Sequence, residues 1–208
     1  MSINHNYNKE IIRKLIHLSS LWMPIFIWLL PYDKSIILFG ALFIFIFISE
    51  QLRINCLKFR YFYNYLFSSI LRDHENNDSP LYVGAFYVIL AVFIALIFFS
   101  KIIAVTSIAV MLISDSASAL IGRKFGKIKI LSKSLEGSIA FFVSGIATVS
   151  LISYLTNQSI NFWIASVFAV LVATIIELIS KDIIKIDDNL SIVLTMTLVI
   201  NFLTKMFM

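Results

Sequence analysis

Seven apolar runs dominate this sequence, and each is about as long as a helix that crosses a lipid bilayer. They cover approximately 15–31, 35–50, 82–100, 102–121, 137–155, 160–180 and 189–206. A membrane-spanning helix needs roughly 17 to 25 mainly apolar residues, so the second run is short for a span. The first run follows a basic stretch but has no small-residue cleavage site, so we expect a retained helix and not a signal peptide. The runs predict an all-α, polytopic transmembrane helical bundle of about seven helices.

The composition agrees with lipid as the main solvent. Of the 208 residues, 60% are apolar and 14% are charged, and the mean hydropathy is +0.92. A soluble core of this size cannot bury that much hydrocarbon. No internal repeat or linker divides the chain, so we expect residues 1–208 to form a single domain. Cys56 is the only cysteine, which excludes an intramolecular disulfide and cysteine-based zinc or iron–sulfur sites.

The basic residues fall almost entirely on one side of this predicted bundle. If seven spans alternate in direction, 14 of the 17 Lys and Arg residues share the side of the N-terminus, and the exceptions are Lys34, Lys101 and Lys205. Cytoplasmic loops carry such an excess, which predicts a cytoplasmic N-terminus, an outside C-terminus and a location in the cell inner membrane. Because these residues flank apolar spans, we expect lipid headgroups or nucleotide phosphates as partners, and no nucleic acid.

Acidic residues gather on the same side. Asp115 lies in the second half of the fourth run, where a carboxylate is costly and marks a functional residue. Glu177 lies near the end of the sixth run, and Asp188 and Asn189 begin the seventh, where helix capping alone accounts for either of them. Capping does not account for Glu177. Acids and bases together at one membrane face are typical of a site that binds a divalent metal and phosphates beside a lipid-embedded substrate.

The loop after the fourth run carries two basic patches with glycines, I-G-R-K-F-G-K at 121–127 and S-K-S-L-E-G-S at 132–138. Backbone amides and basic side chains of such a loop can bind phosphates. It is not a Walker A loop, because no G-x-x-x-x-G-K-[ST] pattern occurs. The structural alternative is a positive-inside loop with glycines that serve packing.

Three other segments have ordinary structural explanations. Arg13, Lys14 and His17 form R-K-x-x-H at the entry to the first run, as a juxtamembrane basic anchor also does. Glu50 and Arg53 are three residues apart and can pair with each other on one helix. The polar residues from Arg72 to Pro80 have the composition of a loop.

Six motifs stand in a fixed order along the chain: R-K-L-I-H at 13–17, S-E-Q-L-R at 49–53, R-D-H-E at 72–75, S-D-S-A-S-A-L-I-G-R-K-F-G at 114–126, K-S-L-E-G-S at 133–138 and D-D-N-L at 187–190. In this order they resemble the family of dolichol kinases, phytol kinases and CTP-dependent diacylglycerol kinases, which is distantly similar to CDP-diacylglycerol synthases. The resemblance covers nearly the whole chain. Ser116 and Ser118 stand where the family often has Ala, and Val193 where Pro is common, but no charged group is lost.

The resemblance implies transfer of the γ-phosphoryl group of CTP, or another nucleoside triphosphate, to the hydroxyl of a polyprenol, phytol or diacylglycerol at the cytoplasmic face. It implies Mg²⁺ held by Asp115 and Asp188, with Glu136 or Glu177 completing the shell. The implied catalytic residues are Asp115, Lys133, Glu136 and Asp188, and the hydroxyl proton goes to Asp115 or His17. The implied nucleotide contacts are Arg13, Lys14, His17, Gly122, Arg123, Lys124, Gly126, Lys133, Ser134, Gly137 and Asn189.

Two alternatives remain open from the sequence. A cytidylyltransferase like the CDP-diacylglycerol synthases would use CTP differently, with release of pyrophosphate. A membrane transporter or scaffold would carry out neither reaction, although transporters more often show mid-membrane charges or repeated halves, which this chain lacks. The acceptor lipid and the oligomeric state are not predicted.

Overall fold

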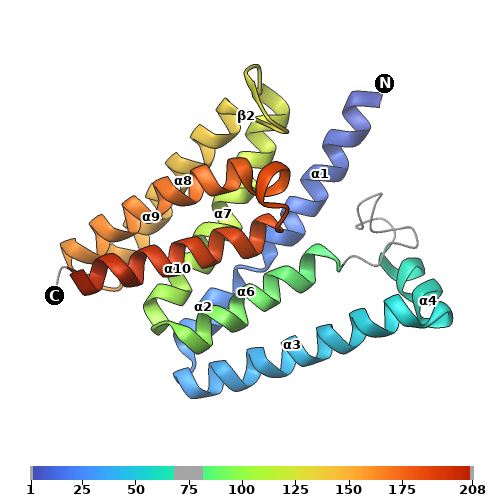
Figure 1. The fold of residues 1–208 in the computed structure, drawn as a ribbon, viewed down its shortest axis with the longest axis horizontal. Coiled ribbons are helices and arrows are strands. Elements are labelled where there is room, and N and C mark those ends of the chain that lie inside the picture. The colour runs from blue at the N-terminus through green and yellow to red at the C-terminus, as the bar shows by residue number, and fades with distance from the viewer. Residues whose placement is uncertain (1, 68–81, 207–208) are drawn as a thin grey trace.

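A computed structural model describes residues 2–67 and 82–206, and helices make up nearly all of this part of the chain (Figure 1). The helices are α1 (Ser2–Ser19), α2 (Trp22–Leu29), α3 (Tyr32–Asn55), α4 (Leu57–Phe67), α6 (Gly84–Phe98), α7 (Lys101–Phe125), α8 (Leu135–Leu155), α9 (Ile160–Ile179) and α10 (Asp188–Met206). A π-helical turn, η1 (Ser180–Ile184), follows α9. Two short antiparallel strands, β1 (Lys129–Ile130) and β2 (Lys133–Ser134), form a hairpin between α7 and α8.

Helices lie at the positions of all seven predicted runs, which confirms the all-α class. Within the described ranges, six segments are long and apolar enough to cross a membrane: Glu10–Leu29, Tyr32–Asn55, Lys101–Phe125, Leu135–Leu155, Ile160–Ile179 and Asp188–Met206. These segments make the protein an integral membrane protein. A seventh crossing, by the 15-residue α6, stays a prediction.

The prediction that the second span is short was wrong, because α3 has 24 residues. Polar residues at both ends of the apolar run continue the helix, from Tyr32 at its start to Asn55 at its end. Tyr32 also anchors the first turn, since its hydroxyl donates a hydrogen bond to the carbonyl of Leu96 at 2.6 Å. The apolar run therefore marked only the middle of this helix.

Helix α7 forms the centre of the bundle. Within an apolar stretch of 18 residues in α7, 78% of the residues are buried inside the protein. The corresponding share is 17–39% in the other five candidate spans. It packs against α8, α10, α1 and α2. Small residues allow the closest approach, because a Cβ atom added at Gly137 of α8 would lie 3.3 Å from the Cα atom of Gly122 of α7.

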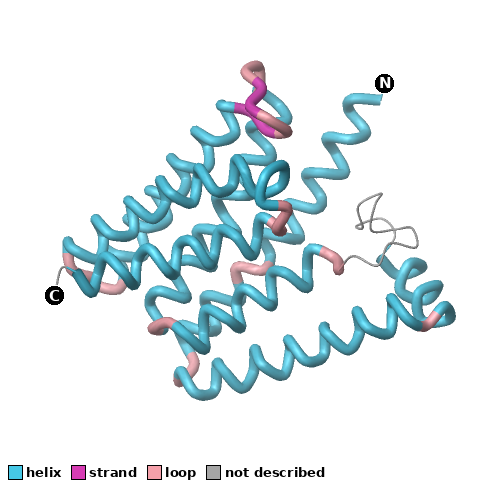
Figure 2. The backbone as a smooth tube through the Cα atoms, in the orientation of Figure 1, coloured by secondary structure: helices cyan, strands magenta, loops and turns pink. Residues whose placement is uncertain are grey.

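Helices α1 and α2 run in the same direction, and α3, α6, α7, α8, α9 and α10 then alternate, so the chain reversals divide between two ends of the bundle (Figures 1 and 2). One end holds the N-terminal half of α1, the β1–β2 hairpin, η1 and the start of α10; we call it the polar end. The turn between α8 and α9, the turn between α2 and α3, and the end of α10 lie at the other end. The basic patches at 121–127 and 132–138 and the D-D-N-L motif at 187–190 therefore lie at the polar end.

Candidate active site

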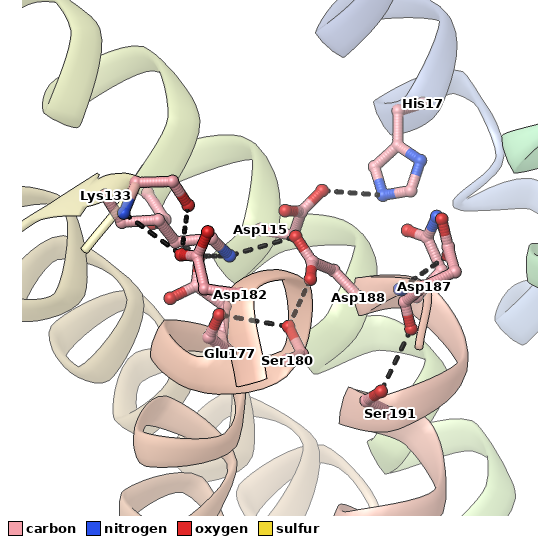
Figure 3. Close-up of polar contacts among 12 residues, drawn as sticks. His17, Asp115, Lys133, Glu177, Ser180, Asp182, Asp187, Asp188 and Ser191 are labelled. Carbon is pink, nitrogen blue, oxygen red and sulfur yellow. Dashed lines mark hydrogen bonds and ion pairs between the residues drawn. The ribbon is translucent and has the colours of Figure 1, made fainter. Parts of the chain in front are cut away.

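Asp115 lies in the second half of α7, where two basic side chains of α1 contact it. Lys14 Nζ donates a hydrogen bond to Asp115 Oδ2, and both side chains are buried. His17 Nε2 lies 3.6 Å from the same oxygen (Figure 3). Lys14 and His17 are three residues apart and share one face of α1. The R-K-x-x-H motif therefore places two of its members on the carboxylate of another helix.

Lys133, at the start of β2, joins two more helices. Its ammonium lies 2.5 Å from Glu177 Oε1 at the end of α9 and 2.9 Å from Asp188 Oδ2 at the start of α10. Ser118 Oγ of α7 donates to the same Glu177 oxygen at 3.1 Å, and Ser180 Oγ donates to the other oxygen of Asp188. Five elements, β2, α7, α9, η1 and α10, thus share this network.

The charge of Lys133 is set by these carboxylates. Burial by itself would lower the pKa of Lys133, but the charges and hydrogen bonds of Glu177 and Asp188 outweigh it, and the pKa is raised above its usual value. Lys133 also lies close enough to Asp115 to interact with it electrostatically. Lys133 is therefore a fixed positive charge at neutral pH and cannot act as a base.

The π-helical turn brings Glu177 and Asp188 together. After Ser180 the chain winds through η1 and reverses at Lys185, whose φ of 58° lies in the left-handed region. Residues in this conformation are uncommon outside glycine and asparagine, so no sequence signal predicted the turn. The reversal lets the last carboxylate of α9 and the first of α10 reach the same ammonium.

Two further carboxylates hold the hairpin that carries Lys133. Glu136 Oε1 accepts hydrogen bonds from the backbone N–H groups of Lys127 and Ile128, at 2.9 and 3.3 Å. Asp182 Oδ2 accepts from Ser132, from its N–H at 3.0 Å and its hydroxyl at 2.6 Å. Glu136 therefore binds the base of the hairpin and Asp182 its tip.

The remaining predicted nucleotide residues have the following places. Arg13 and Arg123 both bind Glu10, and Lys124 is exposed, with its ammonium 5.2 Å from the ring centre of Phe125. Gly122 and Gly137 lie at the contact of α7 with α8. Gly126 is the C-cap residue of α7. Ser134 caps α8, because its hydroxyl accepts a hydrogen bond from the backbone N–H of Gly137. Asn189 donates to Asp187 Oδ1 through both its backbone and its side chain.

The other sequence motifs lie outside this network or outside the described residues. Arg53 and Glu50 are both buried and pair at 2.9 Å, which confirms the pairing predicted from their spacing. Residues 72–75, the R-D-H-E motif, lie in the part of the chain that the structure does not describe. Sequence reasoning did not assign Glu10, Ser118, Ser132, Ser180 or Asp182 to the site.

Comparisons with known proteins agree with these motifs, although no protein-family model and no solved structure matches the chain. The chain is 32% identical to uncharacterized protein RP860 of Rickettsia prowazekii, over 88% of this chain and 89% of that protein. It is 29% identical to CTP-dependent diacylglycerol kinase 1 of Saccharomyces cerevisiae, over 95% of this chain and 74% of the yeast protein. It is 30% identical to a probable chloroplastic phytol kinase of Triticum aestivum, over 64% of this chain and 48% of the wheat protein.

Three observations lead to the same assignment. They are the order of the motifs, their convergence at one end of a membrane bundle, and the similarity to these relatives. The chain is similar to CTP-dependent diacylglycerol kinases and phytol kinases, and these relatives support a polyprenol and lipid kinase-like family.

Proposed function

We propose that this lipid kinase transfers the γ-phosphoryl group of a nucleoside triphosphate, with CTP as the preferred donor, to the hydroxyl of a lipid alcohol. The acceptor is a polyprenol, phytol or diacylglycerol, and the reaction takes place at the cytoplasmic face of the inner membrane. The observation that carries the proposal is the ion-paired network at the polar end, where Lys14, Asp115 and Lys133 come from three different elements. The kinase names of the yeast and wheat relatives support it.

Phosphoryl transfer depends mainly on positioning and on neutralising the charge that develops on the phosphoryl oxygens. Lys133 supplies such a charge on a side chain already oriented by Glu177 and Asp188, so little reorganisation is needed when the nucleotide binds. Arg123 and Lys124 extend the positive surface along the end of α7. We assign all three to the triphosphate.

Magnesium is the metal that fits this donor set. Asp115, Glu177 and Asp188 offer hard oxygen ligands, and Glu177 Oε2 is buried with no hydrogen-bond partner among the described residues. No group of three or more His, Cys, Asp or Glu placed to hold a metal occurs in 2–67 and 82–206. That agrees with an ion that binds together with the triphosphate, because Mg²⁺ usually takes one or two carboxylates plus substrate phosphates.

In this proposal Asp115 and Asp188 would hold Mg²⁺, and oxygens of the triphosphate would complete the shell. Glu136 is left out because its carboxylate binds the backbone of the hairpin. When bound, the ion would neutralise charge on the β- and γ-phosphates.

We assign to Asp115 the role of accepting the proton of the acceptor hydroxyl. This carboxylate lies in the second half of a buried membrane helix and is held by Lys14, with His17 at 3.6 Å, so its orientation is fixed before a lipid binds. The hydroxyl oxygen forms a bond to the γ-phosphorus while the bond to the β–γ bridging oxygen breaks. The hydroxyl proton passes to Asp115, and the nucleoside diphosphate leaves.

The test follows label from γ-labelled CTP into lipid, with purified protein in detergent and a panel of lipid alcohols. Wild type is expected to label the lipid and release CDP. Asp115→Asn, Lys133→Ala and Asp188→Asn should each lower kcat/KM by about 10² to 10³, the usual cost of removing a group that stabilises transition-state charge. Lys129→Ala is the matched control, because Lys129 is an exposed lysine of the same hairpin.

Other outcomes of this experiment reject parts of the proposal. Near wild-type turnover by all three variants would remove the site assignment. Label in pyrophosphate, with CMP attached to the lipid, would identify a cytidylyltransferase. No nucleotide turnover by wild type with any acceptor would favour a transporter or scaffold.

A further inference from the structure

Glu10 is a buried carboxylate on α1 that no sequence motif assigned to the site. Its side chain is only 4% exposed. Glu10 Oε2 accepts from Arg13 Nη1 at 2.8 Å, within α1, and lies 2.9 Å from Arg123 Nη2, at the end of α7. One acid on the first helix thus joins two arginines, one of them on the central helix.

Glu10 and Lys14 connect α1 to α7 through two ion pairs of opposite polarity. On α1 the acid comes one turn before the base, and they bind Arg123 and Asp115 respectively. Because one turn of helix rises about 5.4 Å, sliding α1 by one turn toward the membrane would bring Glu10 level with Asp115. Two carboxylates would then face each other, and Arg123 would lose its partner. The charges therefore permit one register of α1 on α7.

The apolar contacts of α1 fix its register on α7 less firmly than the two ion pairs do. Among the described elements α1 packs mainly against α7, and Ile12, Leu15 and Ile16 of α1 are exposed at the protein surface. Apolar side chains gain little by leaving lipid for another helix, since lipid tails are equally apolar. The position of α1 then depends on its polar contacts.

We infer that Glu10 is a positioning residue that holds α1 in the register where Lys14 stays on Asp115. Its effect on phosphoryl transfer rests on the function proposed above, but its effect on the position of α1 does not. Removing the Glu10 charge should not unfold the protein, because the side chains of Arg13 and Arg123 are 23% and 49% exposed and remain solvated without it. Glu10→Gln is therefore a usable variant.

The first readout is the position of α1. Nitroxide labels at Ile12→Cys on α1 and Val143→Cys on α8, in a Cys56→Ala background, report the distance between α1 and the core of the bundle; both sites are exposed. In Glu10→Gln we expect the distance distribution to shift or broaden by up to about 5 Å, one helical turn. Asp33→Asn, which removes an exposed carboxylate at the other end of the bundle, should leave it unchanged.

The second readout separates kcat from KM. Glu10→Gln should lower kcat by about 10- to 100-fold, as a small misplacement of a catalytic group does, without raising the KM for CTP. The KM stays low because Arg123, released from Glu10, remains able to bind phosphate. Glu10→Asp keeps the charge and should recover part of kcat.

An unchanged label distance in Glu10→Gln overturns the inference. So does a lower melting temperature with unchanged kcat, which is the result expected of a purely structural residue. A raised KM with unchanged distances would make Glu10 part of the nucleotide site instead, and also overturns it. If wild type transfers no phosphoryl group, the proposed function fails, and the label distances alone decide the positioning role.

Discussion

The Lys133 ammonium lies between carboxylates of two different helices, Glu177 and Asp188, so its charge balances two buried or half-buried acids at once. Removing one partner of such a group leaves uncompensated charge in a low-dielectric place, which is costlier than the pair was worth. A lysine in this position links two helices, and in the proposed function its charge would also bind an incoming phosphate.

The raised pKa of Lys133 gives a pH-dependent contribution to stability. Because the pKa is higher in the folded than in the unfolded protein, the ion pairs stabilise fully below the unfolded value of about 10.4. Their contribution is lost as pH rises through the higher folded value. We expect the difference in melting temperature between wild type and Lys133→Met to be constant from about pH 7 to pH 10 and to shrink above that range.

Lys129→Met serves as control for this measurement. Lys129 is exposed on the same hairpin, so its variant should show no comparable pH dependence. A wild-type advantage that already declines between neutral pH and about pH 9 would contradict the raised pKa.

At the scale of elements, the close contact between the end of α7 and the hairpin holds the loop of the site. A Cβ atom at Gly126 would lie 2.2 Å from the carbonyl oxygen of Gly122 and 2.6 Å from Ser134 Oγ. Neither group can move freely, since one is helix backbone and the other caps α8. Glycine at 126 thus allows the chain to leave α7 directly into the hairpin.

We expect Gly126→Ala to lower the free energy of unfolding by about 1 to 3 kcal/mol, the usual cost of overpacking. Gly84→Ala is the matched control, because a Cβ at Gly84 meets no atom within 4 Å. It should be neutral or stabilising by up to about 1 kcal/mol, since it only restricts the unfolded chain. Denaturation in mixed micelles measures both variants, and equal stability of Gly126→Ala and wild type would show that the junction is not tight.

The helices could be predicted from the sequence, but their ends and partners could not. Run length and apolar character mark a span, because backbone groups in lipid must be paired within a helix. Polar helix ends carry no such signal, and α3 therefore exceeded its apolar run. Asp115 and Glu177 stood out as acids in apolar helices, whereas Glu10 lies in a polar stretch where an acid is ordinary. Its role depends on Arg123, which is far away in the sequence and near only in the fold.

At the scale of the molecule, the distribution of charge predicts the orientation in the membrane. The polar end holds the basic hairpin, and the opposite turns hold few charges. We expect Lys34→Cys, in a Cys56→Ala background, to react with an impermeant maleimide on intact cells. Lys129→Cys should react only after the membrane is opened. Both positions are exposed, so protection reports membrane side and not burial.

The reverse labelling pattern would invert the orientation and put the site on the outer face, away from cellular nucleotide. Labelling of both positions from one side would contradict the alternation of the helices. These results are independent of any activity measurement.

The network at the polar end also has a consequence for biosynthesis. Lys14 binds a residue 101 positions later, and Lys133 binds Asp188, which opens the last helix. A ribosome must therefore have synthesised α7 before the first of these ion pairs can form, and α10 before the second. A nascent chain without α10 lacks the Lys133–Asp188 pair, so we expect this part of the network to assemble only after α10 has entered the bilayer.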